Sequence, residues 1–214
     1  VYCGPPGYDV IMGRGGDDVI NGGWGSDVIC GGDGNDELYG GPGGDRLDGE
    51  GGNDRVYGQA GNDGFVLGGD GNDVLSPGAG AFNYTGTVEG HAGRDRIIID
   101  AEGVNEVFGG LGKDTIDFRN SPVGVNVDLR YGQYLDGTLT GVIGYAVWEV
   151  EHVYGSEFAD YIKGSARSNR LYGFGGADHI WGYGNDDLLV GGDGDDWLAG
   201  GAGDDSLDGD DGGD

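Results

Sequence analysis

The nine residues Gly31-Gly32-Asp33-Gly34-Asn35-Asp36-Glu37-Leu38-Tyr39 decide the fold of this chain, because variants of this stretch recur along most of its length. In each variant an aspartate or asparagine stands at the sixth position and a large apolar residue stands two places later. The unit can be written G-G-x-G-x-D-x-U-x, where U is the apolar residue. Repetition at a short fixed period is typical of a solenoid, in which successive repeats stack on one another.

The sixth position of the repeat divides the chain into arrays. A first array runs through Asp9, Asp18, Asp27, Asp36, Asp45, Asp54, Asp63 and Asp73. A weaker array contains Asp95, Asn105 and Asp114, and the array near the C-terminus contains Asp160, Asn169, Asp178, Asp187, Asp196, Asp205 and Asp214. We divide the chain into a first array (1–85), degenerate repeats (86–117), a non-repeat β spacer (118–154) and a C-terminal array (155–214). We expect these segments to form one continuous, elongated solenoid.

Composition excludes several classes of protein. Glycine supplies 54 of 214 residues, which disfavours a helix-rich fold, and 5 prolines without a three-residue glycine period exclude a collagen. The formal net charge of −28 makes nucleic acid an unsuitable partner, and no apolar run is long enough for a membrane span. The 10% aromatic content argues against an acidic disordered tail. The negative charge therefore points to bound cations.

The repeat has a direct geometric meaning. Six glycine-rich residues form a turn, and x-U-x forms a minimal strand with one side chain facing inward. Two repeats make a coil of about 18 residues, which places strands about 4.8 Å apart in parallel pairs. The apolar positions of the repeat, including Phe65, would face the core. The repeat between Asp63 and Asp73 has one extra residue, and we expect Leu67 to be the insertion. The sequence thus predicts an all-β fold, a right-handed parallel β-roll.

Stacked coils bring sixth-position side chains together in ladders. On one side of the first array the ladder is Asp9, Asp27, Asp45 and Asp63, and on the other side it is Asp18, Asp36, Asp54 and Asp73. The C-terminal ladders are Asp160, Asp178, Asp196 and Asp214, and Asn169, Asp187 and Asp205. These ladders contain about eleven gaps, with one more expected between Asp95 and Asp114.

Calcium is the cation that suits such gaps. Carboxylates and backbone carbonyls at about 2.3–2.6 Å, six to eight in all, are what Ca²⁺ requires, whereas Mg²⁺ demands a tighter octahedron. The sequence has no His/Cys cluster for zinc and no EF-hand loop with flanking helices. About eleven Ca²⁺ ions would nearly cancel the negative charge. Asn169 lacks that charge, so a site there should be among the weakest.

These repeats resemble the calcium-binding nonapeptides of the repeats-in-toxin (RTX) family. The resemblance implies a β-roll with calcium in its turns, and a secreted bacterial protein that leaves the cell through a type I exporter and folds outside. It also implies that spacers such as Phe118–Tyr154 interrupt the arrays. Because one apolar side chain per nonapeptide provides a thin core, we expect calcium binding to drive folding.

No catalytic motif accompanies the repeats, since HExxH and GxSxG are absent. We therefore expect the chain not to be an enzyme. Because it begins at Val1 and ends within a Gly/Asp run, we interpret it as a mature or excised piece of a longer polypeptide. Two alternatives to a calcium-driven folding module stay open: a structural or adhesive segment of an extracellular fibre or surface layer, and a calcium-dependent accessory domain of an exported hydrolase.

Two further expectations concern side chains outside the ladders. The register places Tyr161, His179 and Trp197 in one outward row and stacks Tyr39 on Tyr57, and exposed aromatic rows are typical of contact surfaces. This favours self-association or contact with other modules of a longer chain. Cys3 and Cys30 lie one and a half coils apart, so only a folded-back N-terminus would let them form a disulfide.

Overall fold

All regular elements in the described part of the chain are β-strands. The computed structural model describes residues 2–78, 86–99, 104–130, 143–144 and 146–214. Within these residues no helix is long and apolar enough to cross a membrane. The chain forms two compact units, Val1–Asp114 and Thr115–Asp214, and the boundary falls within the segment predicted to hold degenerate repeats.

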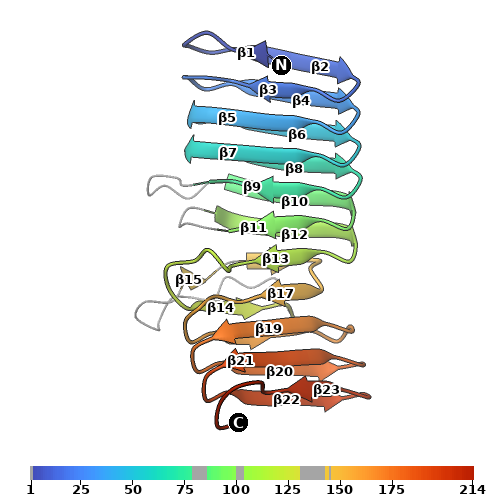
Figure 1. Cartoon of the computed structure of the whole chain (residues 1–214). Coiled ribbons are helices and arrows are strands. Elements are labelled where there is room, and N and C mark those ends of the chain that lie inside the picture. The colour runs from blue at the N-terminus through green and yellow to red at the C-terminus, as the bar shows by residue number, and fades with distance from the viewer. Residues whose placement is uncertain (1, 79–85, 100–103, 131–142, 145) are drawn as a thin grey trace. The chain divides into compact units, whose positions relative to one another are not determined.

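In the first unit, alternate strands belong to two parallel sheets (Figure 1). The first sheet contains, in order, β1 (Tyr2–Cys3), β3 (Val19–Asn21), β5 (Glu37–Gly43), β7 (Arg55–Gly61), β9 (Val74–Ser76) and β11 (Arg96–Ile98). The second contains β2 (Val10–Gly15), β4 (Val28–Asp33), β6 (Arg46–Gly51), β8 (Phe65–Asp70), β10 (Gly86–Gly93) and β12 (Val104–Gly112). Each repeat therefore crosses to the opposite sheet, and two repeats complete one coil.

The strand register follows the predicted coil. Leu38 pairs with Ile20 on one side and with Val56 on the other, each 18 residues away. The inward apolar side chains Leu38, Leu47 and Val56 are fully buried between the sheets. The all-β, right-handed parallel β-roll predicted from the repeat is confirmed, because each x-U-x strand buries its central side chain and turns away through a glycine-rich segment.

One expected core position is wrong. Val66, not Phe65, pairs with Leu47 and is buried, whereas Phe65 is 41% exposed and lies under the guanidinium of Arg46. The extra residue of this repeat is accommodated before Phe65, at Gly64, rather than at Leu67, which is buried. Since side chains alternate between faces along a strand, a shift of one residue exchanges the inward and outward side chains.

The second unit has the same construction around a larger non-repeat segment. One sheet contains β13 (Thr115–Asp117), β17 (His152–Tyr154), β19 (Arg170–Gly175), β21 (Leu188–Asp193) and β23 (Ser206–Asp208). The other contains β15 (Ile143–Gly144), β14 (Val125–Asp128), β18 (Tyr161–Lys163), β20 (His179–Gly184) and β22 (Trp197–Ala202), and β16 spans Ala146–Trp148. Phe118 is fully buried here, so the spacer contributes its own core.

The ends of the repeat pattern differ from its interior. Leu207 lies on β23, the last strand in the order of its sheet, and is 46% exposed. Cys3 and Cys30 are both free thiols, on β1 and β4 of opposite sheets. The regular coil therefore extends to the described N-terminal residues without a folded-back disulfide.

Candidate metal centre in the aspartate ladders

The sixth-position residues are joined into ladders by hydrogen bonds. The backbone N–H of Asp36 donates to Oδ1 of Asp54 at 2.7 Å, and the N–H of Asp18 donates to Oδ1 of Asp36 at 2.7 Å. The same bond, at 2.7–3.0 Å, forms thirteen rungs in the described residues: 9–27, 18–36, 27–45, 36–54, 45–63, 54–73, 73–95, 95–114, 160–178, 169–187, 178–196, 187–205 and 196–214.

All eleven predicted gaps are rungs of these ladders, and the expected Asp95–Asp114 contact also forms. Sequence reasoning missed the rung between Asp73 and Asp95, which lie 22 residues apart. The extra residues fall between β9 and β10, outside the nine-residue period. The second ladder of the first unit therefore continues through Asp114.

In eleven of these aspartates the other carboxylate oxygen is buried without a hydrogen-bond donor in the described residues. In the described part of the chain, no hydrogen-bond donor reaches Oδ2 of Asp9, Asp27, Asp36, Asp45, Asp54, Asp63, Asp73, Asp95, Asp178, Asp187 or Asp196. Burying a carboxylate oxygen without a donor or a cation is costly. This repeated arrangement therefore calls for a positively charged ligand in each turn.

Backbone carbonyls lie beside the same oxygens. A Cβ added at Gly22 would lie 2.6 Å from both Oδ2 of Asp27 and the carbonyl oxygen of Gly40, one coil further on. The first glycine of the repeat is thus required, because it leaves a small space lined by a carboxylate and a carbonyl. Gly182 does the same in the second unit, beside Asp187 and the carbonyl of Gly200.

Most regular turns also have glycine at the fourth position. Gly25 and Gly34 adopt φ near +140° there, a conformation that residues with a Cβ rarely reach. At the second position, where Gly32 has φ +110°, other residues such as Arg14 and Glu50 adopt φ of 82° and 70°. Most regular turns thus have a left-handed backbone at two places.

Burial dominates the electrostatics of the ladders. It raises the pKa of Asp45 and Asp54 to about 6, and that of Asp63 and Asp73 to about 7. It raises the pKa of Asp178 to about 8. Hydrogen bonds from the backbone of the preceding coil act in the opposite direction. These carboxylates are therefore poorly stabilised as anions by the protein alone.

The donor set fits a hard, oxygen-loving cation. No group of three or more His, Cys, Asp or Glu side chains in the described residues is placed to hold a metal ion. The unpartnered oxygens are carboxylate atoms next to backbone carbonyls. Such all-oxygen sets suit Ca²⁺. The ladder aspartates, with the first-position carbonyls one coil further on, are the groups that would hold it.

Two predicted ligands differ from the others. Asp160 and Asn169 are buried, but their side-chain oxygens accept hydrogen bonds from Ser156 and Ser165 of their own turns. At the ladder ends, Asp9, Asp18 and Asp205 are half-buried and Asp214 is exposed. The remaining sixth-position aspartates are buried.

The structure also contains ionic contacts that the repeat pattern did not predict. Asp117 receives two bonds from the guanidinium of Arg119, at 3.0 and 2.8 Å, and Asp128 receives the same pair from Arg130, at 2.9 and 2.6 Å. Both carboxylates are buried. The motif D-x-R, at the start of the spacer and again within it, is the sequence signal that could have predicted these pairs.

Parallel coils with aspartate ladders in glycine-rich turns define a calcium-binding β-roll. The family model for the RTX calcium-binding nonapeptide repeat matches residues 6–38, 30–65, 39–75, 65–81, 154–189 and 181–214, well over half of the chain. The chain belongs to the RTX calcium-binding nonapeptide repeat family. A comparison with curated proteins found no significant match.

Proposed function

We propose that the ladders bind about eleven Ca²⁺ ions and that this binding drives the folding of an extracellular protein. The observation that carries the proposal is the row of buried, unpartnered Oδ2 atoms, each beside a carbonyl of the next coil. A divalent cation would satisfy both groups and offset the charge repulsion along the ladder. We further propose that the chain is not itself an enzyme.

The thin core supports coupling between binding and folding. Each nonapeptide buries one large apolar side chain, such as Leu38 or Leu47, while nine residues of backbone become ordered. Ordering the backbone opposes folding, and one side chain offsets only part of that cost. Calcium binding free energy would then become folding free energy. Secretion fits this scheme, since a site of this kind fills where free calcium is abundant.

Circular dichroism of the full chain in EGTA and in millimolar Ca²⁺ tests the proposal. We expect a coil-like spectrum in EGTA and a β spectrum in calcium. Because neighbouring rungs share aspartates, the calcium titration should be cooperative, with a Hill coefficient above one. The same β spectrum in both conditions would refute the coupling of folding to calcium.

A structural role in a fibre or surface layer is a second candidate, supported by outward aromatic side chains. The predicted row is confirmed: Tyr161, His179 and Trp197 are register partners, with ring centroids 4.8 and 6.3 Å apart. Trp197 is 47% exposed, and its ring lies 4.9 Å from that of Trp181. Sedimentation of the calcium-loaded chain at several concentrations separates this candidate from a monomeric module.

A further inference from the structure

Two turns at the start of the C-terminal array do not adopt the conformation of most other turns. Their fourth position is Phe158 in one turn and Arg167 in the other, where the regular repeat has glycine at strongly positive φ. Neither residue adopts a positive φ, although Asn185 does so at the same position of a later repeat, with φ 64°. At the second position these turns carry Ser156 and Ser165, also without positive φ. These two turns therefore have a different backbone conformation from turns such as that of Asp36.

In the first of these turns, a serine donates hydrogen bonds to both oxygens of the carboxylate. The N–H of Ser156 donates to Oδ2 of Asp160 at 2.6 Å, and its hydroxyl donates to Oδ1 at 2.8 Å. The N–H of Val125 donates to the same Oδ1 at 2.7 Å. Both oxygens of Asp160 thus have donors, in contrast to the eleven ladder aspartates named above, whose Oδ2 lacks one in the described residues.

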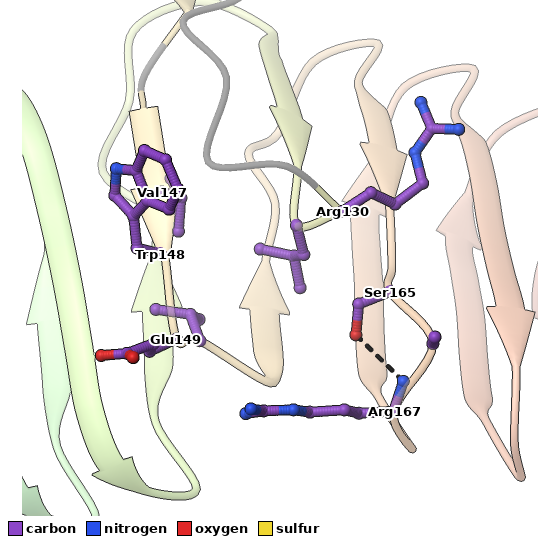
Figure 2. Close-up of a pocket in the computed structure, with 9 residues that line it drawn as sticks. Arg130, Val147, Trp148, Glu149, Ser165 and Arg167 are labelled. Atoms are coloured by element: carbon purple, nitrogen blue, oxygen red, sulfur yellow. Dashed lines mark hydrogen bonds between the residues drawn. The ribbon is translucent and has the colours of Figure 1, made fainter.

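The second turn repeats the arrangement with an amide. Oδ1 of Asn169 accepts from the N–H of Ser165 at 2.7 Å, and Nδ2 donates to the carbonyl of Glu151 at 2.9 Å. The hydroxyl of Ser165 accepts from the N–H of Arg167 at 3.2 Å (Figure 2). Arg167 in turn binds Oε1 of Glu151 at 2.6 Å. The amide nitrogen of Asn169 is a hydrogen-bond donor, whereas a calcium ligand has to present an oxygen atom to the metal.

The neighbouring spacer uses arginine where the ladders present unpartnered carboxylates. Asp117 and Asp128 are neutralised by Arg119 and Arg130, and the guanidinium of Arg119 also lies 4.9 Å from the ring centroid of Tyr154. These pairs lie on or directly after β13 and β14, which are register partners of β17 and β18. Arg119 contacts Tyr154 of β17, and Nζ of Lys163 on β18 lies 4.0 Å from Oδ2 of Asp128, so both strands beside the first serine turn have contacts that need no metal.

We propose that turns 155–160 and 164–169 are closed by hydrogen bonds from their own serines to Asp160 and Asn169. They bind no calcium, and they keep β17 and β18 ordered in the absence of calcium. The inference rests on the proposed function for the regular turns. When calcium binds, the coils with regular turns would fold next to the strands that are already ordered. Two of the thirteen rungs are then excluded as calcium sites, which leaves eleven. That is the number expected from the sequence, although from a different set of rungs.

Counting bound calcium by native mass spectrometry of the full chain tests the first part. Asn169→Asp alone should bind no more calcium than the wild type, because the serine closure persists. Ser165→Gly combined with Arg167→Gly and Asn169→Asp restores the repeat consensus and should bind one ion more. Ser168→Gly, at an exposed position of the same turn, is the matched control and should leave the count unchanged. A gain with Asn169→Asp alone, or none with the triple variant, would overturn the assignment.

Hydrogen exchange of the full chain in EGTA tests the second part. The amides of β17 and β18 should exchange about 100-fold more slowly than those of β22, since locally stable segments are protected. Ser156→Gly with Ser165→Gly should abolish this difference. If calcium folds the chain but β18 exchanges as fast as β22 in EGTA, this inference fails and the proposed function stands. If no calcium binds to any variant, the proposed function fails.

Discussion

At the scale of single residues, the first glycine of each repeat leaves the space that the metal site needs. Gly49 and Gly51 belong to the same turn and neither has a positive φ, so an alanine at either position is compatible with the backbone. A Cβ at Gly49 would lie 2.5 Å from Oδ2 of Asp54 and 3.0 Å from its Cβ. A Cβ at Gly51 would meet only Oδ1 of Asp33, at 3.8 Å.

This pair gives a matched test. Gly49→Ala should destabilise the calcium-loaded chain by about 1–3 kcal/mol, since the methyl group overpacks the site. Gly51→Ala should change stability by less than about 0.5 kcal/mol. Urea unfolding in millimolar calcium measures both effects. Equal losses would indicate that the space beside Asp54 has no special role.

At the scale of elements, a rung's place in its ladder decides its importance. Asp36 takes part in rungs with both Asp18 and Asp54, whereas Asp9 has one rung, to Asp27. A parallel chain of bonds on the outer side of the turns joins Asp17, Asn35, Asn53 and Asn72. Loss of a central aspartate therefore affects two interfaces between coils, and loss of a terminal aspartate affects one.

We expect Asp36→Ala to raise the calcium concentration at the folding midpoint by roughly tenfold, and Asp9→Ala by less than about threefold. The control is Asp33→Ala, which removes the same charge from an exposed position of the turn that contains Asp36. Calcium titrations followed by circular dichroism compare the three variants. Equal midpoints for the Asp36 and Asp9 variants would argue against shared rungs.

At the scale of the whole molecule, fourteen aspartates in the described part of the chain are buried, in a protein whose formal net charge is −28. Burial raises the pKa of Asp45, Asp63 and Asp178 to about 6, 7 and 8 in the calcium-free fold. A raised pKa means that protonation stabilises this fold. That stabilisation is fully present below about pH 4 and is lost as the pH rises through 6 to 8.

Calcium and protons should therefore compete for the ladders. Between pH 8 and pH 5.5 the calcium midpoint for folding should rise by about tenfold or more, because the carboxylates must ionise to bind the metal. In EGTA, the β signal should be larger at pH 4 than at pH 8. Circular dichroism at both extremes measures the two effects, and a midpoint independent of pH would contradict them.

Much of this protein follows from its sequence because the repeat is local and periodic. The nine-residue spacing of Asp27, Asp36 and Asp45 predicts which side chains stack, since two repeats per coil place residues 18 apart on the same side. It also predicts the calcium chemistry, because aspartate and glycine recur together in every regular turn. The outward row of Tyr161, His179 and Trp197 follows from the same register.

Only the tertiary structure decided what happens where the period breaks. The inward position of Val66 and the rung from Asp73 to Asp95 depend on how neighbouring coils absorb inserted residues, and that is determined by packing between strands. The serine closure of Asp160 depends on the backbone angles of one turn, because these bring the N–H and hydroxyl of Ser156 to the carboxylate. A nine-residue pattern specifies the residue types in a turn, whereas the partners of each oxygen are determined by the folded geometry around it.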